Sequence, residues 1–389
     1  MRILFVHEVN YLTKPIYEMH EFPEHLAANG HEVAFWHFPE GYSKQQISEL
    51  GFKTAIQGRV VNSSRITLFT PQLGGGLIGR LVTAIKAGGL AKAVISNFKP
   101  DLIVSFSVPT QGWQLIPPAR RAKVPVLFRA LDVSHKIRTG IFSKLIYLAE
   151  KRVYRRSTWL SANNPAMLQY CVSMGAKSQR ASVEWPPIDL QRFETSLAPS
   201  GLKASLGIAK DSKVILYMGS FFYFSGLPEV IRAFARSEGQ EHLVLIGGGE
   251  QDKELRELVS ELGIENRVTF TGFISFEHLP GYLKIADIAI NPMHRSLVAN
   301  AAIPNKVIQY LAAGLPVVST RLDGLEKTFG SGSRLTLVSS AEEVIESAIA
   351  WCRTGEGSEN SADLDLERFT LSRSIEAFEK RCREVAQSA

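Results

Sequence analysis

The sequence predicts an α/β protein built from two successive Rossmann-like units that face one another across a cleft. Its 389 residues exceed what one ordinary core requires. Short β-branched runs alternate with helix-like segments along most of the chain, which is typical of parallel α/β layers. A proline-rich, polar stretch at about 184–201 interrupts this alternation near the middle. We therefore expect a first unit over residues 1–195 and a second over 200–367.

In the first half, helices are expected over about 23–29, 77–97 and 142–156, and the first of them ends at Gly30, a common C-terminal stop. The opening residues, MRILFVHEV, lack the long apolar region and cleavage site of a signal peptide, so we expect a buried strand there. The strand candidates are RILFV (2–6), HEVAFWHF (31–38), ITLF (66–69), DLIVSFS (101–107), VPVLFRA (124–130) and TWLSAN (158–163).

In the second half, a helix is expected to begin with Pro304 in its first turn and to end before Gly314. Its apolar positions leave Lys306 and Gln309 on a neighbouring face. A last helix, about 371–387, is expected to dock on the first unit, which would then include residues 368–389. The strand candidates are VILYMGS (214–220), HLVLIGGG (242–249), RVTFTGF (267–273), IADIAINP (285–292) and GLPVVST (314–320).

The composition, with 45% hydrophobic and 21% charged residues, is that of a soluble globular protein. No stretch approaches the roughly 20 continuous apolar residues of a membrane span. Cys171, Cys352 and Cys382 have no paired spacing, so they predict neither a zinc site nor a disulfide framework. We expect a cytoplasmic protein.

Positive charge is concentrated between Glu49 and Glu150, where Asp101 and Asp132 are the only acids. The net charge of this window is about +12, against +6 for the whole chain. Nucleic acid, an anionic membrane and a diphosphate-bearing substrate are the candidate partners, and a solvated face without a partner is the alternative. The basic residues are Lys53, Arg59, Arg65, Arg80, Lys86, Lys92, Lys99, Arg120, Arg121, Lys123, Arg129, Lys136, Arg138 and Lys144.

The helix expected at 142–156 is amphipathic. Such a helix can rest on an anionic bilayer, although most apolar stripes of this kind face a protein core. We hypothesise a peripheral membrane association at this helix. Its apolar residues are Ile141, Phe142, Leu145, Ile146 and Val153, and its basic residues are Lys144, Lys151, Arg152, Arg155 and Arg156.

Several motifs, in order, resemble those of the retaining glycosyltransferases that build bacterial surface polysaccharides (group 1, family 4 type). The resemblance covers almost the whole chain and implies the two-domain glycosyltransferase-B fold. In the second half the motifs are Tyr217–Ser220 with Ser225-Gly226, Leu243–Glu250, Val268–Phe273, Ala286–Pro292 and Pro304–Val318. In the first half they are Asn29–Val33, Pro100-Asp101 and Pro186–Phe193.

The resemblance implies that the helix after Pro304 receives a nucleoside diphosphate sugar, with the ribose near Gln309. A helix N-terminus and the charge of Lys306 suit a phosphate, whereas a surface lysine that reaches water is the alternative. The Gly247–Gly249 turn lacks the full dinucleotide fingerprint and is more typical of a tight connection. The candidate donor-binding residues are Gly219, Ser220, Ser225, Gly226, Gly248, Phe273, Arg295, Asn305, Lys306 and Gln309.

The sequence departs from the family at several positions. Ala301 and Gln309 stand where many relatives carry two glutamates, and Ser220 and Ser225 stand where relatives carry an arginine and a lysine. The residues His7–Asn10 replace a glycine-rich loop. These changes leave open either a subgroup with different donor contacts or a protein that has lost catalysis.

The candidate catalytic residues are Asp132 and His135, at the carboxyl edge of a strand in the expected acceptor domain, and His294, on a loop near the donor. A helix cap and an ordinary surface histidine are the alternatives for Asp132 and His135. The resemblance implies sugar transfer with retention, to a glycan or polyprenyl-diphosphate-linked acceptor. No paired carboxylates suit a double displacement, so a front-face mechanism is expected, without metal or other cofactor.

Four further functions are alternatives, two of them disfavoured. A sugar-nucleotide epimerase of the same fold would turn over the donor without an acceptor. A non-catalytic protein could use the basic face to dock a partner or a membrane. Nucleic-acid binding is disfavoured because the basic window has no motif with interleaved aromatic residues, and a nicotinamide dehydrogenase is disfavoured by the missing fingerprint.

Overall fold

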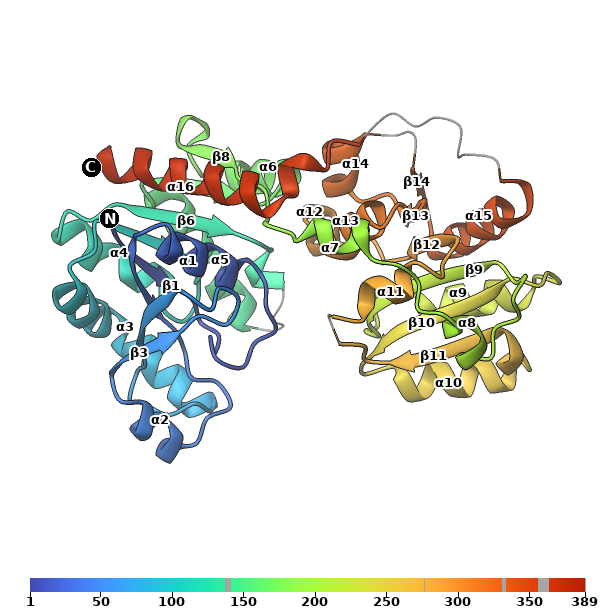
Figure 1. Cartoon of the computed structure of the whole chain (residues 1–389). Coiled ribbons are helices and arrows are strands. Elements are labelled where there is room, and N and C mark those ends of the chain that lie inside the picture. The colour runs from blue at the N-terminus through green and yellow to red at the C-terminus, as the bar shows by residue number, and fades with distance from the viewer. Residues whose placement is uncertain (137–140, 276, 331–333, 356–363, 389) are drawn as a thin grey trace. The chain divides into compact units, whose positions relative to one another are not determined.

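The computed structural model describes residues 1–136, 141–275, 277–330, 334–355 and 364–388 (Figure 1). The chain divides into two compact units, one formed by Met1–Ile188 with Arg368–Ala389 and the other by Asp189–Glu367. Each unit contains its own largely parallel β-sheet, which confirms the predicted α/β class. No helix among the described residues has both the length and the hydrophobicity that crossing a membrane requires.

The sheet of the first unit has eight strands, and all neighbours are parallel except β3 and β4. The order reverses between β1 and β5, because the chain moves from β1 towards β2 and later from β5 towards β8. In spatial order the strands are β3 (Lys53–Gln57), β4 (Arg65–Phe69), β2 (Glu32–Trp36), β1 (Arg2–Val6), β5 (Leu102–Ser105), β6 (Val126–Ala130), β7 (Trp159–Ala162) and β8 (Ala181–Val183).

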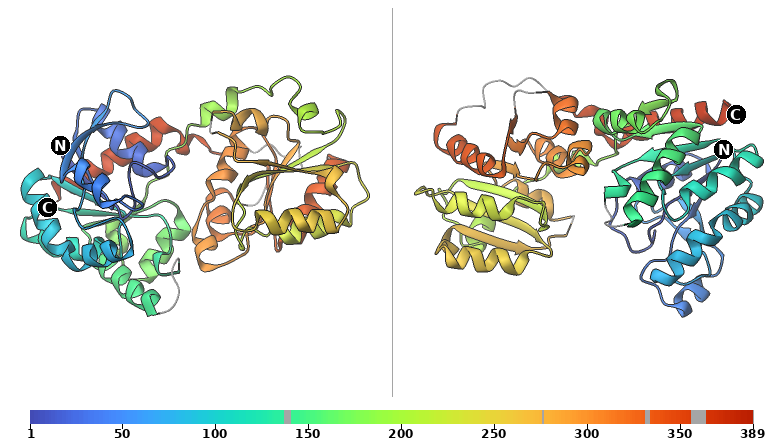
Figure 2. Two further views of the ribbon diagram at one scale, coloured as in Figure 1. Left: turned by 90° about the horizontal axis from the view of Figure 1, so that it is seen from below. Right: turned by 180° about the vertical axis from the view of Figure 1, so that it is seen from behind.

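Helices cover both faces of this sheet. On one face α1 (Glu18–Ala28) packs against α16 (Leu371–Gln387), with the rings of Phe22 and Phe378 stacked 3.9 Å apart. Both views in Figure 2 show α16, in red, against the first unit. The other face carries α3 (Leu77–Phe98) and α4 (Gly112–Arg121), followed by α5 (Ile141–Arg156) against α4. The remaining helices are α2 (Lys44–Leu50), η1 (Ser134–Lys136), α6 (Pro165–Ser173) and η2 (Ser178–Arg180).

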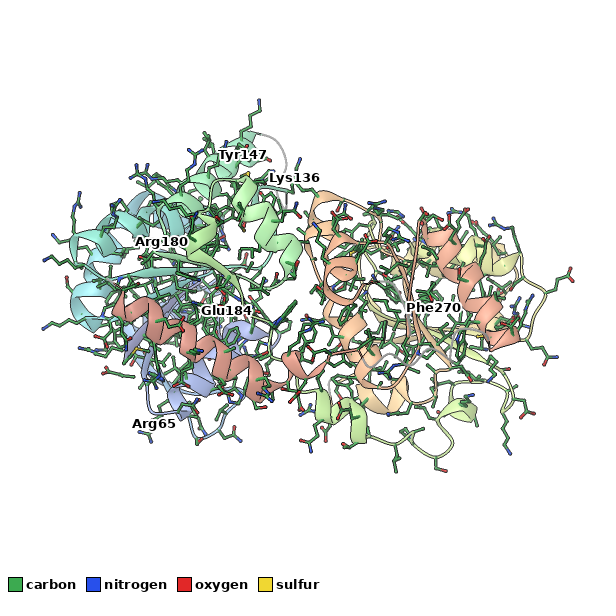
Figure 3. The ribbon with its side chains drawn as sticks, turned by 90° about the horizontal axis from the view of Figure 1, so that it is seen from above. Arg65, Lys136, Tyr147, Arg180, Glu184 and Phe270 are labelled. Atoms are coloured by element: carbon green, nitrogen blue, oxygen red, sulfur yellow. The ribbon has the colours of Figure 1, made fainter. Side chains whose placement is uncertain are left out.

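Arg129 of β6 is fully buried and ties α1 to the sheet. Its guanidinium donates two hydrogen bonds of 2.7 Å to the carboxylate of Glu18 in α1. It also donates to the Ser161 hydroxyl and to the carbonyls of Ala162 and Glu184. Glu184, labelled in Figure 3, in turn accepts a hydrogen bond from Arg381 of α16. Arg129 is therefore an interior tether, since its donors are engaged within the fold.

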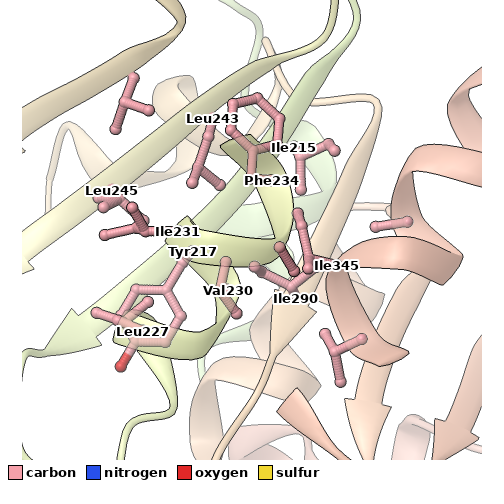
Figure 4. Close-up of a cluster of buried hydrophobic side chains, with 14 of the residues drawn as sticks. Ile215, Tyr217, Leu227, Val230, Ile231, Phe234, Leu243, Leu245, Ile290 and Ile345 are labelled. Atoms are coloured by element: carbon pink, nitrogen blue, oxygen red, sulfur yellow. The ribbon is translucent and has the colours of Figure 1, made fainter. Parts of the chain in front are cut away.

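The sheet of the second unit has six parallel strands, and its order reverses between β9 and β12. In spatial order they are β11 (Val268–Gly272), β10 (His242–Gly248), β9 (Val214–Ser220), β12 (Ile288–Asn291), β13 (Val317–Thr320) and β14 (Leu335–Val338). Its core joins this sheet to α9 and α15, as Figure 4 shows. The helices are α7 (Leu190–Thr195), α8 (Leu202–Ser205), α9 (Leu227–Ala235), α10 (Asp252–Glu261), η3 (Glu265–Arg267), α11 (Leu279–Leu283), α12 (Leu297–Ala301), α13 (Asn305–Ala312), α14 (Asp323–Phe329) and α15 (Ala341–Thr354), and η4 (Glu367–Phe369) spans the boundary.

Two predicted helix starts are wrong. The helix α1 begins at Glu18 rather than near Pro23, and Pro23 lies inside it. Pro304 is the N-cap of α13 and lies before its first turn, in extended backbone with ψ 117°. The strands β3, β8 and β14 were not predicted.

Candidate functional site

A cavity of about 190 Å³ lies at the carboxyl edge of the sheet in the second unit. Its walls come from β9 and the loop after it, from the end of β12 and the residues that follow, and from α13. The lining residues are Tyr217, Ser220, Phe222, Phe224, Ser225, Asn291, Met293 and Lys306.

The strand order places this cavity. The sheet reverses its direction of growth between β9 and β12, so the connections leaving these two strands turn away from each other. A crevice forms at such a switch point, and ligands of open α/β sheets bind there. A larger cavity of about 530 Å³ is lined by residues such as Lys210 and Asp287, which precede β9 and β12 at the opposite edge. We therefore assign the functional site to the smaller cavity.

Lys306, the second residue of α13, supplies the charge in the cavity. Its ammonium donates a 3.0 Å hydrogen bond to the Tyr217 hydroxyl and lies 4.1 Å from the centre of that ring. The Tyr217 hydroxyl in turn donates to the Ser220 carbonyl at 3.0 Å. No carboxylate of the described residues pairs with Lys306. An anion bound beside Lys306 would therefore be the counter-charge of its ammonium. Burial lowers the pKa of Lys306 to about 7.

Two buried polar atoms in the cavity wall have no hydrogen-bond partner within the part of the chain that is described. They are the hydroxyl oxygen of Ser225, 3% exposed, and the amide oxygen of Asn291, a fully buried residue. The amide nitrogen of Asn291 donates to Ser319 at 2.9 Å, which fixes the amide and leaves its oxygen unpaired. Leaving such atoms unsatisfied costs about 1–3 kcal/mol each. A polar ligand in the cavity would remove this cost.

Two helices begin at this cavity. Ser225 precedes Gly226, the N-cap of α9, and Lys306 lies in the first turn of α13. No side chain of the described residues caps either helix. The first amides of a helix carry a partial positive charge and bind anions. The two helix ends and Lys306 therefore favour a negatively charged group.

Gly226 has a structural reason to be glycine. Its φ is 72°, and a Cβ there would lie 2.0 Å from the Pro292 carbonyl oxygen. The start of α9 thus packs directly on the chain after β12, which keeps the two walls of the cavity together.

The structure brings only part of the predicted donor-binding set together. Ser220, Ser225 and Lys306 line the cavity, and Gly219 lies beside Lys306. Gly226 lies next to Ser225, whereas Gly248 is the last residue of β10 and lies against the ring of Phe273.

The remaining predicted residues of this unit lie outside the cavity lining. Phe273 is 80% exposed after β11. His294 Nε2 lies 3.3 Å from a carboxylate oxygen of Glu229, and Arg295 Nη2 lies 4.0 Å from Asp323 Oδ1. Asn305 and Gln309 lie on the same helix as Lys306. Asn305 is the first residue of α13, and Gln309 lies about one turn after Lys306.

Sequence reasoning missed four lining residues, Phe222, Phe224, Asn291 and Met293, and gave Tyr217 no role. A signal existed, since all five lie at or near the carboxyl ends of predicted strands. Asn291 and Tyr217 belong to two of the family-like motifs. That their side chains line the same cavity depends on the pairing of β9 with β12.

In the first unit, the switch point lies between β1 and β5, and His7 and Glu8 follow β1 there. His7 stacks on Phe106 at 5.3 Å, and its Nε2 lies 3.1 Å from the Tyr17 hydroxyl. Burial lowers the pKa of His7 to about 3, so the ring is neutral. The carboxylate of Glu8 accepts a 2.8 Å hydrogen bond from the Thr110 amide after β5.

Asp132 and His135 follow β6, one strand away from that switch point. Burial and then the charges of Glu150 and Glu8 raise the pKa of Asp132 to about 6. His135 is 8% exposed, so it is no surface histidine. Its Nδ1 lies 2.6 Å from Glu150, and the Tyr170 hydroxyl lies 3.3 Å from both groups. Asp132 is half-buried at the carboxyl edge of the sheet, whereas His135 belongs to a buried network with Glu150 and Tyr170.

Comparison with known families gives two matches along this chain. Residues 201–362 match the family described as Glycosyl transferases group 1. Residues 18–183 match the Glycosyl transferase 4-like domain. The two matches fall in the second and first structural units, respectively.

Three curated relatives are similar in sequence. An uncharacterized glycosyltransferase of Methanocaldococcus jannaschii is 25% identical over 47% of this chain and 47% of its own length. A D-inositol 3-phosphate glycosyltransferase of Arthrobacter is 27% identical over 49% of this chain and 45% of its own length. The chain therefore spans about half the length of these first relatives. A glycosyl transferase of Escherichia coli named for colanic acid biosynthesis is 24% identical over 77% of this chain and 78% of its own length.

Solved structures share the fold at low identity. The Anabaena protein HepE in complex with UDP and glucose superposes with a TM-score of 0.73 at 18% identity, over 98% of this chain and 99% of that one. A sucrose-phosphate synthase of Thermosynechococcus elongatus superposes with a TM-score of 0.74 at 18% identity, over the whole of both chains.

Proposed function

Since the chain belongs to the group 1 family of glycosyltransferases, with the glycosyltransferase-B fold, we propose that it transfers a sugar from a nucleoside diphosphate sugar to a glycan or lipid-linked acceptor. One observation carries this proposal. A cavity at the switch point of the second unit joins Lys306 and two uncapped helix starts to the unpaired hydroxyl of Ser225, which can donate to an anion, while the unpaired amide oxygen of Asn291 can accept from a hydroxyl of the sugar nucleotide. Such an anion-binding cavity suits the diphosphate of the donor. HepE, which has the same fold, was solved with UDP and with UDP-glucose.

Relatives carry an arginine and a lysine at the positions of Ser220 and Ser225, and the cavity offers other positive groups that can bind the diphosphate. Charge develops on the diphosphate as the bond to the sugar breaks, and fixed positive charge stabilises it. Lys306 and the amides of α9 and α13 supply this charge from rigid elements. A hydroxyl of Ser225 can donate to a phosphate oxygen, and this would satisfy its buried oxygen.

We further propose retention at the anomeric carbon, by attack of the acceptor on the face from which the diphosphate departs. No carboxylate lines the described cavity, and a double displacement would require one close to the sugar carbon. Since the positive charge comes from Lys306 and helix amides, the proposed step needs no metal. Gln309 and Asn305, on the same helix, are assigned to the ribose and sugar side of the donor.

The acceptor is assigned to the first unit, at the edge that carries Glu8 and Asp132. With a pKa of about 6, Asp132 is ionised at neutral pH and can accept a proton or a hydrogen bond from an acceptor hydroxyl. His135 is assigned a positioning role through Glu150. We place the protein in the cytoplasm, at the inner face of the membrane, because its three cysteines are free and the first unit is strongly basic.

A thermal-shift screen against UDP, GDP, ADP, CMP and their sugar conjugates tests the donor site. A ligand at 100 times its dissociation constant adds about 2.7 kcal/mol of stability, so a selective upward shift with one nucleotide is expected. Lys306→Ala should reduce kcat/KM about tenfold to a hundredfold, because it removes a charged contact of about 1.5–3 kcal/mol. Equal kcat/KM in the variant would place the diphosphate elsewhere.

The same screen separates the alternatives. An epimerase would convert the bound sugar nucleotide in the absence of any acceptor. A non-catalytic docking protein would show no shift with any nucleotide, and this result would contradict the proposed transferase.

A further inference from the structure

Large apolar side chains lie exposed on three neighbouring helices of the first unit. Among the described residues, seven of the nine exposed large hydrophobic side chains of this unit lie on α3, α4 and α5. The exposed fraction reaches 71% for Leu77, 78% for Ile78 and 83% for Ile85. The seven residues, which we name the α3–α5 face, are Leu77, Ile78, Leu81, Ile85, Trp113, Leu145 and Leu148.

The three helices form one continuous layer. Helix α4 contacts both α3 and α5. The side-chain amide of Gln114 in α4 donates to the Ala84 carbonyl of α3 at 2.8 Å, and the guanidinium of Arg152 in α5 lies 6.0 Å from the ring centre of Trp113. All three helices begin after the carboxyl ends of parallel strands, so their first halves lie towards the same edge of the sheet. In Figure 2 they are the cyan to green helices.

The structure corrects the predicted membrane contact. Of the stripe expected on α5, Ile146 and Val153 are buried, at 5% and 1% exposure, and therefore belong to the core. The side chains of Ile141 and Phe142 lie outside the described set, and only Leu145 is exposed. The main exposed ridge lies instead on α3, at residues spaced one turn apart, where the sequence predicted only a helix.

The three helices that carry this face are rich in basic residues. The sequences of α3, α4 and α5 contain one acid, Glu150, which is fully buried and bound to His135. These helices therefore present no exposed carboxylate of their own, and Arg80 is paired with Glu40, from the loop after β2, at 3.0 Å. Their basic residues are Arg80, Lys86, Lys92, Arg120, Arg121, Lys144, Lys151, Arg152, Arg155 and Arg156. An anionic bilayer has an apolar interior and a negatively charged surface. Helices that carry both exposed apolar side chains and many cations complement such a bilayer.

We propose that the α3–α5 face docks this protein on an anionic lipid bilayer, with the α3 side chains inserted among the lipid headgroups. The face adjoins the proposed acceptor edge, because Arg80 of α3 donates to the Glu8 carbonyl and to the Thr110 hydroxyl, in the loops after β1 and β5. The inference rests on the proposed function in one respect, the lipid-linked acceptor. An enzyme docked on the bilayer through this face would have its acceptor edge close to the sugar of such an acceptor.

Vesicle flotation of the full chain tests this docking. The protein is expected to float with vesicles of equal parts phosphatidylglycerol and phosphatidylcholine at low salt. It is expected to remain at the bottom with phosphatidylcholine alone or at high salt, where the attraction between basic residues and lipid is screened. The double variant Ile78→Ser/Ile85→Ser should lower the partition constant about tenfold or more, since two exposed apolar side chains are lost from the inserted ridge.

The matched control is Leu197→Ser, which alters a side chain that is 86% exposed in the second unit and should float as the wild type does. Both variants should keep the wild-type calorimetric transition of the first unit, to which Ile78 and Ile85 belong, so a fold defect is recognised separately. Absence of flotation by the wild type at low salt, or equal flotation by the double variant, would overturn the proposal. A double variant that turns a wild-type dimer into a monomer, with no vesicle binding by either, would show an interface between copies instead.

Failure of the proposed function would give a different pattern. If no nucleotide shifts the thermal transition but the vesicles still bind, the docking face stands and the transferase assignment fails. If nucleotide binds and sugar is transferred to a soluble acceptor without vesicle binding, the transferase assignment stands and the docking face fails.

Discussion

Lys306 shows how burial can prepare a single residue for an anion. Its ammonium contacts the Tyr217 ring and hydroxyl but no carboxylate of the described chain. Burial lowers its pKa from 10.5 to about 7, so the charged form is disfavoured until an anion arrives. Between these two pKa values the unfolded chain binds more protons than the folded chain. The contribution of Lys306 to the free energy of unfolding therefore rises with pH over this window.

Nucleotide binding is consequently expected to take up a proton. A diphosphate beside Lys306 stabilises the ammonium and raises its pKa, so binding at about pH 8.5 should take up close to one proton. At about pH 6 the lysine is already protonated and uptake at this site should vanish. Calorimetry in two buffers of different ionisation enthalpy measures this difference.

Lys306→Arg is the matched control, because an arginine stays protonated throughout this range. It should bind nucleotide with no uptake at either pH. Equal uptake by wild type and Lys306→Arg would assign the proton to another group.

At the scale of the element, the carboxyl end of β10 depends on close backbone packing against β9. Gly247 has a φ of 126°, and a Cβ there would lie 2.0 Å from the Gly219 carbonyl oxygen. Gly248, the next residue, has no such φ, and its Cβ would meet only the edge of the Phe273 ring at 3.0 Å. Gly247, within β10, therefore serves mainly to bring β9 and β10 together.

Gly247→Ala should lower the free energy of unfolding by about 2 kcal/mol or more, because it combines backbone strain with a clash that neither strand can relieve. Gly248→Ala should cost far less, since the exposed Phe273 ring can turn away. Urea unfolding of both variants gives the comparison. Similar losses in the two would show that the turn is not limited by backbone contact at Gly247.

Some elements could be predicted closely from the sequence. The strand β9 and the helix α16 have the predicted bounds, because a continuous apolar run and a clear helical period identify them. The edge strands β3 and β14 were missed, since they are short and partly exposed. The start of α1 was misplaced because Pro23 was given a first-turn position, whereas the helix begins five residues earlier.

The candidate site could be predicted less completely than the fold. Lys306, Ser220 and Ser225 were found because they belong to motifs with a local signature. Asn291 and Phe224 required knowing that β12 pairs with β9, which joins segments more than 60 residues apart. The burial of His135 could not be predicted, because its partner, Glu150, comes from a later helix.

At the scale of the whole molecule, the two units have separate hydrophobic cores. One core contains Phe22 and Phe378, and the other contains Phe234 and Ile345. The chain of the first unit is discontinuous, since α16 returns to it after the second unit is complete. The proposed nucleotide cavity is lined only by residues of the second unit. Nucleotide binding and the packing of α16 should therefore stabilise different units.

Thermal unfolding is expected to separate these two effects. Phe378→Ala removes a fully buried ring that stacks on Phe22, so it should destabilise the first unit by about 3–5 kcal/mol. The added nucleotide should stabilise only the second unit, by about 2.7 kcal/mol at 100 times its dissociation constant. In the variant, calorimetry should show an early transition that does not respond to nucleotide and a later one that does. Phe234→Ala, the matched change in the core of the second unit, should instead lower the nucleotide-sensitive transition. One joint transition that shifts equally in both variants would mean that the two cores unfold as a single cooperative unit, despite their separate packing.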